Sequence, residues 1–245
     1  MTRVRILLPL LGCALLGCVL LALFAPGGVL RRDGEPPPEG REPYDPAGRI
    51  GAAQEHLRRH PDDAATWAGL GGAYLEQARR TADVAYYGKA EGAFRRSLRL
   101  PVPGGPHIDA VIGMGALANA RHDFAGGRRW AERARSAAPH RWALYGVLTD
   151  SYLELGDYER AEGALRTMLD GRPDLASFTR AARVEWLRGR TGAAREALLR
   201  SREIAGGPAE RAFVLWQLGE LAWSGGDPRA ALAAYGEALA ADPAH

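Results

Sequence analysis

The spacing of hydrophobic and polar residues divides the chain into three parts. From Ile6 to Ala25, twenty residues follow one another without a charge. From there to about residue 45, proline, glycine and charged residues dominate and no apolar periodicity is present. After Asp45, apolar residues recur at helical spacing, with turn signals about every fifteen to eighteen residues. The pattern therefore predicts an apolar segment over 1–25, a linker over 26–45 and an all-α region over 46–245.

The helical region is repetitive. Pro139 and Pro173 each close an alanine-rich helix and are 34 residues apart, and Pro243 closes another such helix. Alignment on these prolines gives five units, near 64–105, 108–141, 142–174, 175–208 and 212–245. The fourth position of each unit is apolar and the eighth is small or nearly so. The eighth positions are Gly71, Gly115, Thr149, Ala182 and Gly219. Small side chains let two helices approach closely, so each unit is expected to be a helix pair.

The turn residues agree with helix pairs. Gly156-Asp157 and Gly226-Asp227 each supply a glycine to end one helix and an aspartate to cap the next. Pro228 then occupies the first helical position, where its missing N–H costs nothing. Gly113 and Gly115 lie inside an expected helix, where we interpret them as sites of close packing rather than as a phosphate-binding loop.

The first unit reads Trp67-x-x-Leu70-Gly71-x-x-Tyr74, followed by Ala90-x-x-x-Phe94. This pattern resembles the tetratricopeptide repeat, and five units in register strengthen the resemblance. It implies a right-handed α-solenoid of about five helix pairs, with a shorter amphipathic helix over 47–59 as an N-terminal cap. Two departures stand out. About seven extra residues follow Tyr74. Gly206-Gly207 replaces the closing proline of the fourth unit and about three extra residues follow, so the pattern determines the packing of the fourth unit on the fifth least well.

The apolar segment has the length of a single transmembrane helix. Arg3 and Arg5 precede it, which favours an N-terminus in the cytoplasm and a helical region outside it. We expect an uncleaved anchor. A lipoprotein signal at Cys13 or Cys18, or cleavage and secretion, are the alternatives, although Pro26 after Ala25 disfavours cleavage. The linker contains Pro36-Pro37-Pro38 and reads as an extended spacer.

Composition excludes some chemistry. The two cysteines both lie in the apolar segment, so the helical region is expected to contain neither a disulfide nor a thiolate metal site. The formal net charge is +3, and no concentrated basic stripe is visible along the sequence, so we expect no nucleic-acid partner. His56 and His60 lie four residues apart, but no third ligand accompanies them, and we interpret them as a solvated helix end. We therefore expect no enzyme activity, no metal and no cofactor.

The resemblance implies that the first helices line a groove that binds a protein or peptide. In this sequence the inward positions of the family include Asn119, Asp150, Glu154, Arg183, Trp186, Trp216, Glu220 and Trp223. They predict an acidic patch in the middle and tryptophan anchors near the C-terminal end. Lysine and asparagine do not occupy the positions of the carboxylate clamp found in co-chaperone members, so a chaperone adaptor is not expected.

Two functions follow as expectations. The first is a membrane-anchored scaffold that binds a protein or peptide through the groove. The alternative is a homo-oligomer that associates through the last unit, which has no polar capping helix. In that case the tryptophans would only fill gaps between units, and the charges would only be solvated.

Overall fold

The computed structural model describes residues 45–243, and the apolar segment, most of the linker and the last two residues lie outside this range. The described part is entirely helical, without a β-strand, which confirms the predicted all-α class. Its helices are α1 (Pro46–Arg59), α2 (Ala64–Thr81), α3 (Ala85–Arg99), α4 (Ile108–Ala120), α5 (Phe124–Ala137), α6 (Ala143–Glu154), α7 (Tyr158–Gly171), α8 (Leu175–Leu187), α9 (Thr191–Ile204), α10 (Pro208–Ser224) and α11 (Pro228–Ala241).

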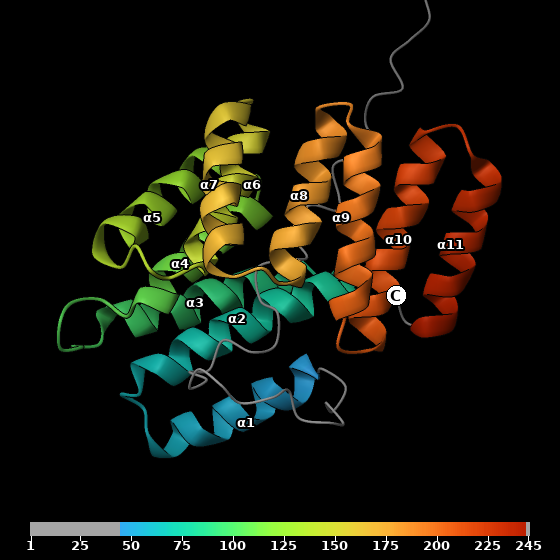
Figure 1. Cartoon of the computed structure of the whole chain (residues 1–245). Helices are drawn as coiled ribbons and strands as arrows, with labels where there is room; N and C mark the ends of the chain where they lie inside the picture. The colour runs from blue at the N-terminus through green and yellow to red at the C-terminus, as the bar shows by residue number, and fades with distance from the viewer. Residues whose placement is uncertain (1–44, 244–245) are drawn as a thin grey trace, which may run out of the picture.

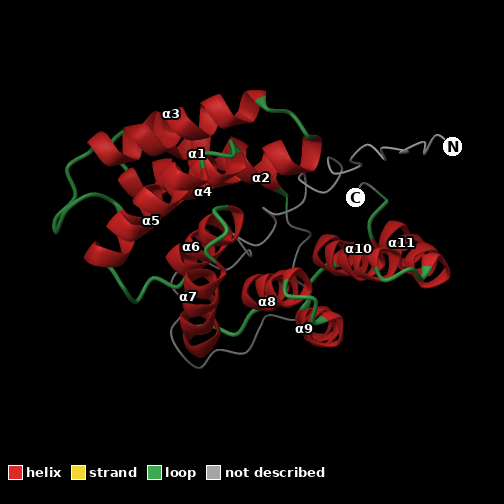
Figure 2. Ribbon diagram, turned by 90° about the horizontal axis from the view of Figure 1, so that it is seen from above, coloured by secondary structure: helices red, strands yellow, loops and turns green. Residues whose placement is uncertain are grey.

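The helices α2 to α11 form five antiparallel pairs, and each second helix packs on the first helix of the next pair. Helix α1 packs on α2, where Gln54 donates a hydrogen bond to the Tyr74 hydroxyl and Leu57 is buried. Figure 2 shows the pairs in a curved row. The first helices α6, α8 and α10 lie on the inner side of the curve, and α7, α9 and α11 lie on the outer side (Figures 1 and 2).

The turns form for the local reasons that the sequence suggests. Gly156 and Gly226 adopt the left-handed backbone conformation, with φ of 78° and 80°. The side chains of Asp157 and Asp227 accept hydrogen bonds from the first-turn N–H groups of Arg160 and Ala230. These caps satisfy donors that a helix start otherwise leaves unpaired. They set the sharp reversal within the third and fifth pairs.

Glycines in the first helices let bulky side chains of neighbouring helices reach the backbone. The Phe94 ring is fully buried between Gly71 and Gly113, where an added Cβ would lie 2.5 and 2.3 Å from ring carbons. Likewise, a Cβ on Gly219 would lie 2.3 Å from the Tyr235 ring. The predicted close-packing role of Gly113 is therefore confirmed.

The hydrophobic core is not one continuous cluster. The largest cluster runs from Leu57 through the first three pairs to Leu165, with Val184 at its edge. A separate cluster joins α8, α9 and α10 around Leu198 and Phe213. The first helices of successive pairs pack directly on one another in the first four pairs: α2 on α4, α4 on α6 and α6 on α8. In contrast, α8 and α10 make little direct contact. The fourth and fifth pairs therefore hold together mainly through α9 and α10.

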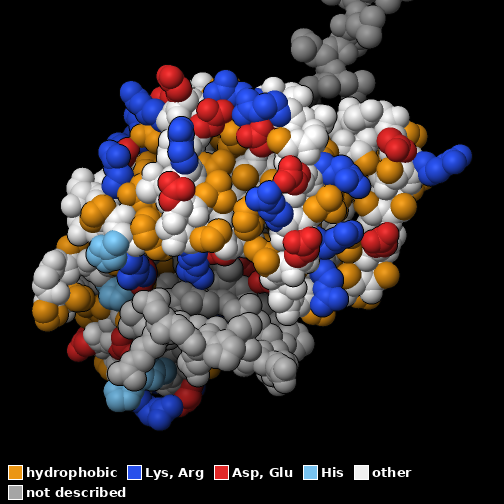
Figure 3. Space-filling view, in the orientation of Figure 1, with side chains coloured by type: hydrophobic (Ala, Val, Ile, Leu, Met, Phe, Trp, Pro, Cys, Tyr) orange, Lys and Arg blue, Asp and Glu red, His pale blue; other side chains and the backbone are white. Residues whose placement is uncertain are grey.

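Within residues 45–243, no helix combines the length and the hydrophobicity needed to cross a membrane. The predicted membrane segment itself falls outside the described residues. On the face seen in Figure 3, acidic and basic side chains alternate over the helices, with hydrophobic side chains between them. This distribution matches the many ion pairs that link neighbouring helices.

Candidate partner-binding surface

All eight residues predicted to face a partner lie on first helices. Asn119 is on α4, Asp150 and Glu154 are on α6, Arg183 and Trp186 are on α8, and Trp216, Glu220 and Trp223 are on α10. Their exposure differs widely, from fully buried to largely open. The surface that they form is therefore smaller than the sequence suggested.

Asn119 is buried between α4 and α6 and does not face a partner. Its side-chain amide donates to the Val147 carbonyl oxygen at 3.1 Å, and its oxygen accepts from the Ser151 hydroxyl at 2.8 Å. Asn119 is 1% exposed, and its two hydrogen bonds pair buried polar groups across the boundary between the second and third helix pairs. This corrects its expected role: Asn119 is an internal link of the array.

Asp150 is also an internal link. It is 1% exposed and accepts two hydrogen bonds from Arg180, Nε to Oδ1 at 3.0 Å and Nη2 to Oδ2 at 2.8 Å. Arg180 further donates to the carbonyl oxygens of Gly146 and Ala176. Burial raises the pKa of the Asp150 carboxyl, and the Arg180 guanidinium opposes that rise. The carboxylate that was expected to form an acidic patch is therefore enclosed and paired.

Sequence reasoning missed Arg180. It lies at the sixth position of the fourth unit, where the first three units have Gly69, Gly113 and Val147. A long charged residue at a place that holds small or apolar residues in the first three units is a signal of a buried ionic partner. The partner is on the preceding unit, thirty residues earlier in the chain.

Glu154 and Arg183 form a second ion pair across the same boundary, with Arg183 Nη2 2.6 Å from Glu154 Oε1. Their side chains are 13% and 24% exposed, so both border the surface. The Nε atom of Arg183 is buried without a hydrogen-bond partner. The middle of the predicted groove therefore carries paired charges rather than a free acidic patch.

The three tryptophans lie on α8 and α10, where these first helices diverge. Trp186 and Trp216 are half-buried and both pack against the cluster around Phe213. The Trp216 ring stacks on that of Phe213, with 6.2 Å between centroids and 22° between planes. Trp223 is 62% exposed. We call Trp186, Trp216, Glu220 and Trp223 the tryptophan face.

Glu220 is held in place by α11. It accepts a hydrogen bond from the Tyr235 hydroxyl at 2.6 Å, which is possible because Gly219 leaves room for the ring. Desolvation and this hydrogen bond raise the pKa of Tyr235 to about 12. The position of one carboxylate beside Trp216 and Trp223 is therefore fixed by packing within the fifth pair.

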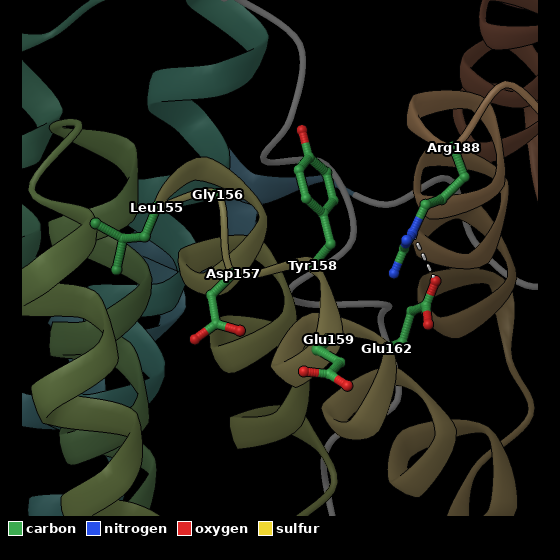
Figure 4. Close-up of a pocket in the computed structure, with 7 residues that line it drawn as sticks. All are labelled: Leu155, Gly156, Asp157, Tyr158, Glu159, Glu162 and Arg188. Carbon is green, nitrogen blue, oxygen red and sulfur yellow. Dashed lines mark ion pairs between the residues drawn. The ribbon is translucent and has the colours of Figure 1, made fainter.

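Figure 4 shows a separate open pocket of about 690 Å³ between the α6–α7 turn and the end of α8. Arg188 donates toward Glu162 at 2.9 Å, and its guanidinium lies over the Tyr158 ring at 5.6 Å. Asp157 is paired with Arg160. Most of the charged side chains that line this pocket therefore already form ion pairs with neighbouring residues. The sequence analysis did not predict this pocket.

The histidines predicted to be a solvated helix end lie at the C-terminal end of α1. His56 lies 2.9 Å from Asp63 through Nε2, and its ring lies 4.6 Å from that of His60. No group of three or more His, Cys, Asp or Glu side chains in residues 45–243 has an arrangement that could hold a metal ion.

Comparisons with known proteins agree with the geometry. Residues 214–245 match the tetratricopeptide repeat family model, and no curated protein matches the sequence significantly. Three similar solved structures are the APC/C hetero-tetramer Cut9-Hcn1 (TM-score 0.66, 17% identity), the thermophilic TPR protein TTC0263 of Thermus thermophilus (0.58, 19%) and a tetratricopeptide repeat protein of Parabacteroides merdae (0.55, 16%).

The alignments cover 81%, 71% and 67% of this chain, and 37%, 92% and 61% of the respective matched chains. The chain thus spans little more than a third of the first of these structures. At these identities the similarity establishes the fold alone. The family model thus covers most of the last helix pair, α10 and α11, and the five stacked pairs have the fold of the tetratricopeptide repeat structures to which the chain is similar.

Proposed function

We propose that this chain is a scaffold that binds a protein or peptide through the tryptophan face. The observation that carries the proposal is Trp223, a large aromatic side chain 62% exposed on α10, one of the helices on the inner side of the curved array. Burial of one tryptophan removes about 150–250 Å² of surface from water, and tryptophans dominate many interfaces.

The neighbours of Trp223 suit the same role. Trp216 and Trp186 are partly open and rigidly packed from behind, so a partner would meet pre-ordered rings and lose little side-chain entropy. Glu220 adds a carboxylate that lies between Trp216 and Trp223 in the sequence and is held by the Tyr235 hydroxyl. This carboxylate favours a partner that presents a hydrogen-bond donor or a positive charge. Among similar structures, Cut9 occurs in a hetero-tetramer, which is consistent with a scaffold.

We further propose that residues 6–25 hold the chain at a membrane, with the helical array outside the cytoplasm. The support is the uncharged run of twenty residues with two arginines before it. Under this proposal the linker separates the array from the bilayer and leaves the tryptophan face open to a partner.

Self-association is the second candidate, and one observation favours it. On α11, Leu232 and Leu239 are 69% and 55% exposed, with Gly236 between them on the same side of the helix. The positions that correspond to Leu232 in the other four units hold Glu91, Arg128, Glu162 and Arg195. A leucine at this place favours an apolar neighbour, which a second copy would supply.

One experiment separates the two functions. Full-length protein with a C-terminal tag would be purified from membranes and sized, beside Trp223→Ala and Leu232→Ala/Leu239→Ala. The proposal expects one enriched partner, lost in Trp223→Ala and retained in the leucine variant. Recovery of the chain alone, as an oligomer that only the leucine variant dissociates, would instead establish self-association. Trp216 is not used because its replacement would also disturb the core beneath it.

A further inference from the structure

Helix α5 carries an excess of positive charge that its neighbours do not neutralise. It contains Arg128, Arg129, Arg133 and Arg135 and a single acid, Glu132. Glu132 is already occupied, because it pairs with Arg135 at 2.7 Å and accepts a hydrogen bond from the Tyr152 hydroxyl at 2.7 Å. Among the described residues, Arg128, Arg129 and Arg133 form no ion pair.

These arginines lie on the side of α5 away from the core. Arg129 and Arg133 are exposed, while Ala131 and Ala134 on the opposite side of the helix are fully buried. The guanidinium of Arg133 lies over the Trp130 ring, 5.5 Å from its centroid, a cation–π contact that favours this position of the side chain. The sequence showed no basic stripe because the arginines are interrupted by Trp130 and Glu132, whereas the fold collects them on one face.

The charge of the array is polarised along its length. Residues 85–141, from α3 to the end of the second pair, contain ten Lys and Arg but four Asp and Glu. Residues 142–243 contain twelve Lys and Arg but fifteen Asp and Glu. Half of this excess of positive charge lies on α3 and half on α5, and no such excess is present in the half of the chain that holds the tryptophan face.

We propose that the outer face of α5, centred on Arg129 and Arg133, docks on the anionic headgroups of a lipid bilayer. The proposal rests on the membrane location proposed above. Guanidinium groups bind phosphate with paired N–H donors, and a face on one outer helix suits the flat sheet of phosphates at a bilayer surface. Nucleic acid is the less fitting occupant, since the arginines lie on an outward face rather than in a groove.

The length of the chain before the array allows this contact. Twenty linker residues span at most about 70 Å when fully extended, so the array stays close to any bilayer that holds residues 6–25. A tethered surface experiences a high effective concentration of headgroups, and a few arginines then suffice for docking. Docking through α5 would leave the tryptophan face, on a different part of the array, free for its partner.

Arginine footprinting of the full-length protein tests this directly. The protein would be reconstituted into vesicles of phosphatidylcholine alone or of phosphatidylcholine mixed with phosphatidylglycerol. A dicarbonyl reagent would then modify arginines for detection by mass spectrometry. We expect Arg129 and Arg133 to react at least about fivefold more slowly in the anionic vesicles, with the difference abolished by high salt. Arg195 and Arg202, exposed on α9, should react equally in both.

A pair of matched variants completes the test. Arg129→Gln/Arg133→Gln should remove the lipid-dependent protection of Arg128, whereas Arg195→Gln/Arg202→Gln, with the same change in charge, should retain it. Equal reactivity of Arg129 and Arg133 in both vesicles would overturn the proposal, as would protection by a DNA duplex but not by anionic lipid. Flotation with phosphatidylcholine vesicles reports separately on the membrane anchor. If the protein does not float with these vesicles but the α5 arginines are still protected in anionic vesicles, the proposed anchor is wrong and the proposed docking face stands.

Discussion

Arg180 and Asp150 form a buried, two-pronged ion pair that joins the third and fourth helix pairs, with N–O distances of 3.0 and 2.8 Å. It lies where the large hydrophobic cluster of the first three pairs gives way to the smaller cluster around α8 and α10. Both side chains are almost fully buried, so neither charge can be satisfied by water if its partner is lost.

Removal of one member of this pair should therefore destabilise the array strongly. We expect Asp150→Ala to lower the free energy of unfolding by about 3–5 kcal/mol, because it leaves the Arg180 charge buried and unpaired. The double variant Asp150→Leu/Arg180→Met should recover most of the loss. Urea denaturation followed by circular dichroism measures both, and a loss near zero in Asp150→Ala would contradict the buried pairing.

The glycines around Phe94 give a prediction about packing. Gly71→Ala and Gly113→Ala should each destabilise the protein by about 1–3 kcal/mol, because the new Cβ overlaps the enclosed Phe94 ring. Gly92→Ala on α3 is the matched control. It has open space around its Cα and should be neutral or stabilising by up to about 1 kcal/mol through helix propensity. Thermal unfolding of the three variants separates these effects, and equal midpoints would refute the close approach.

The cap of α2 predicts a dependence on acid. The Asp63 carboxylate accepts hydrogen bonds from the Thr66 hydroxyl at 2.7 Å and from the Ala65 and Thr66 N–H groups at 3.0 Å. The Thr66 side chain in particular lowers the pKa of Asp63 below its ordinary 3.8. A lowered folded-state pKa stabilises the fold above the unfolded value, and this stabilisation is lost as pH falls through the folded value.

Asp63→Ala should thus cost about 1 kcal/mol at neutral pH. The difference from the unmodified chain should shrink as pH falls below about 4. Denaturant midpoints at several pH values check this. A difference that stays constant down to about pH 2 would mean that the carboxylate charge of Asp63 does not contribute.

The raised pKa of Tyr235 predicts that the stability of the fold also depends on pH at the alkaline end. Its pKa is raised from 10.0 to about 12, first by desolvation and then by its hydrogen bond to Glu220. Because the folded-state pKa is raised, this stabilisation is complete below about pH 10 and is lost as pH rises from about 10 toward 12. Tyr235→Phe should be less sensitive to alkali over that range. When tyrosine absorbance is titrated, the Tyr235→Phe variant should lack one tyrosine that ionises near pH 12 in the unmodified chain. Identical titration curves for the two proteins would contradict the raised pKa of Tyr235.

The local features of the fold could be predicted because short segments determine them. Gly156 and Asp157 specify a turn by themselves, and the small residues at the eighth position of each unit indicate where two helices approach closely. The exposure of the candidate residues could not be predicted in the same way. The repeat register indicates which face of a first helix Asn119 and Asp150 occupy, but their burial depends on how closely α6 and α8 pack beside them.

The divergence of α8 from α10 illustrates the same limit. Gly206-Gly207 and the extra residues before α10 marked this junction as the one whose packing the repeat pattern determines least. They did not indicate that α9 would carry most of the contact, or that Trp186 and Trp216 would share one hydrophobic cluster. The Tyr235–Glu220 hydrogen bond was also beyond sequence reasoning, since it requires the Gly219 backbone to accept the ring at close range.

Site-specific photocrosslinking in intact membranes would show whether the tryptophan face contacts a partner. A photoreactive phenylalanine would replace Trp223 in one variant and Ala193, exposed on α9, in a matched control. We expect a crosslink from position 223 to one distinct protein and none from position 193. Crosslinks that are absent at 223, or that join only copies of this chain, would contradict it.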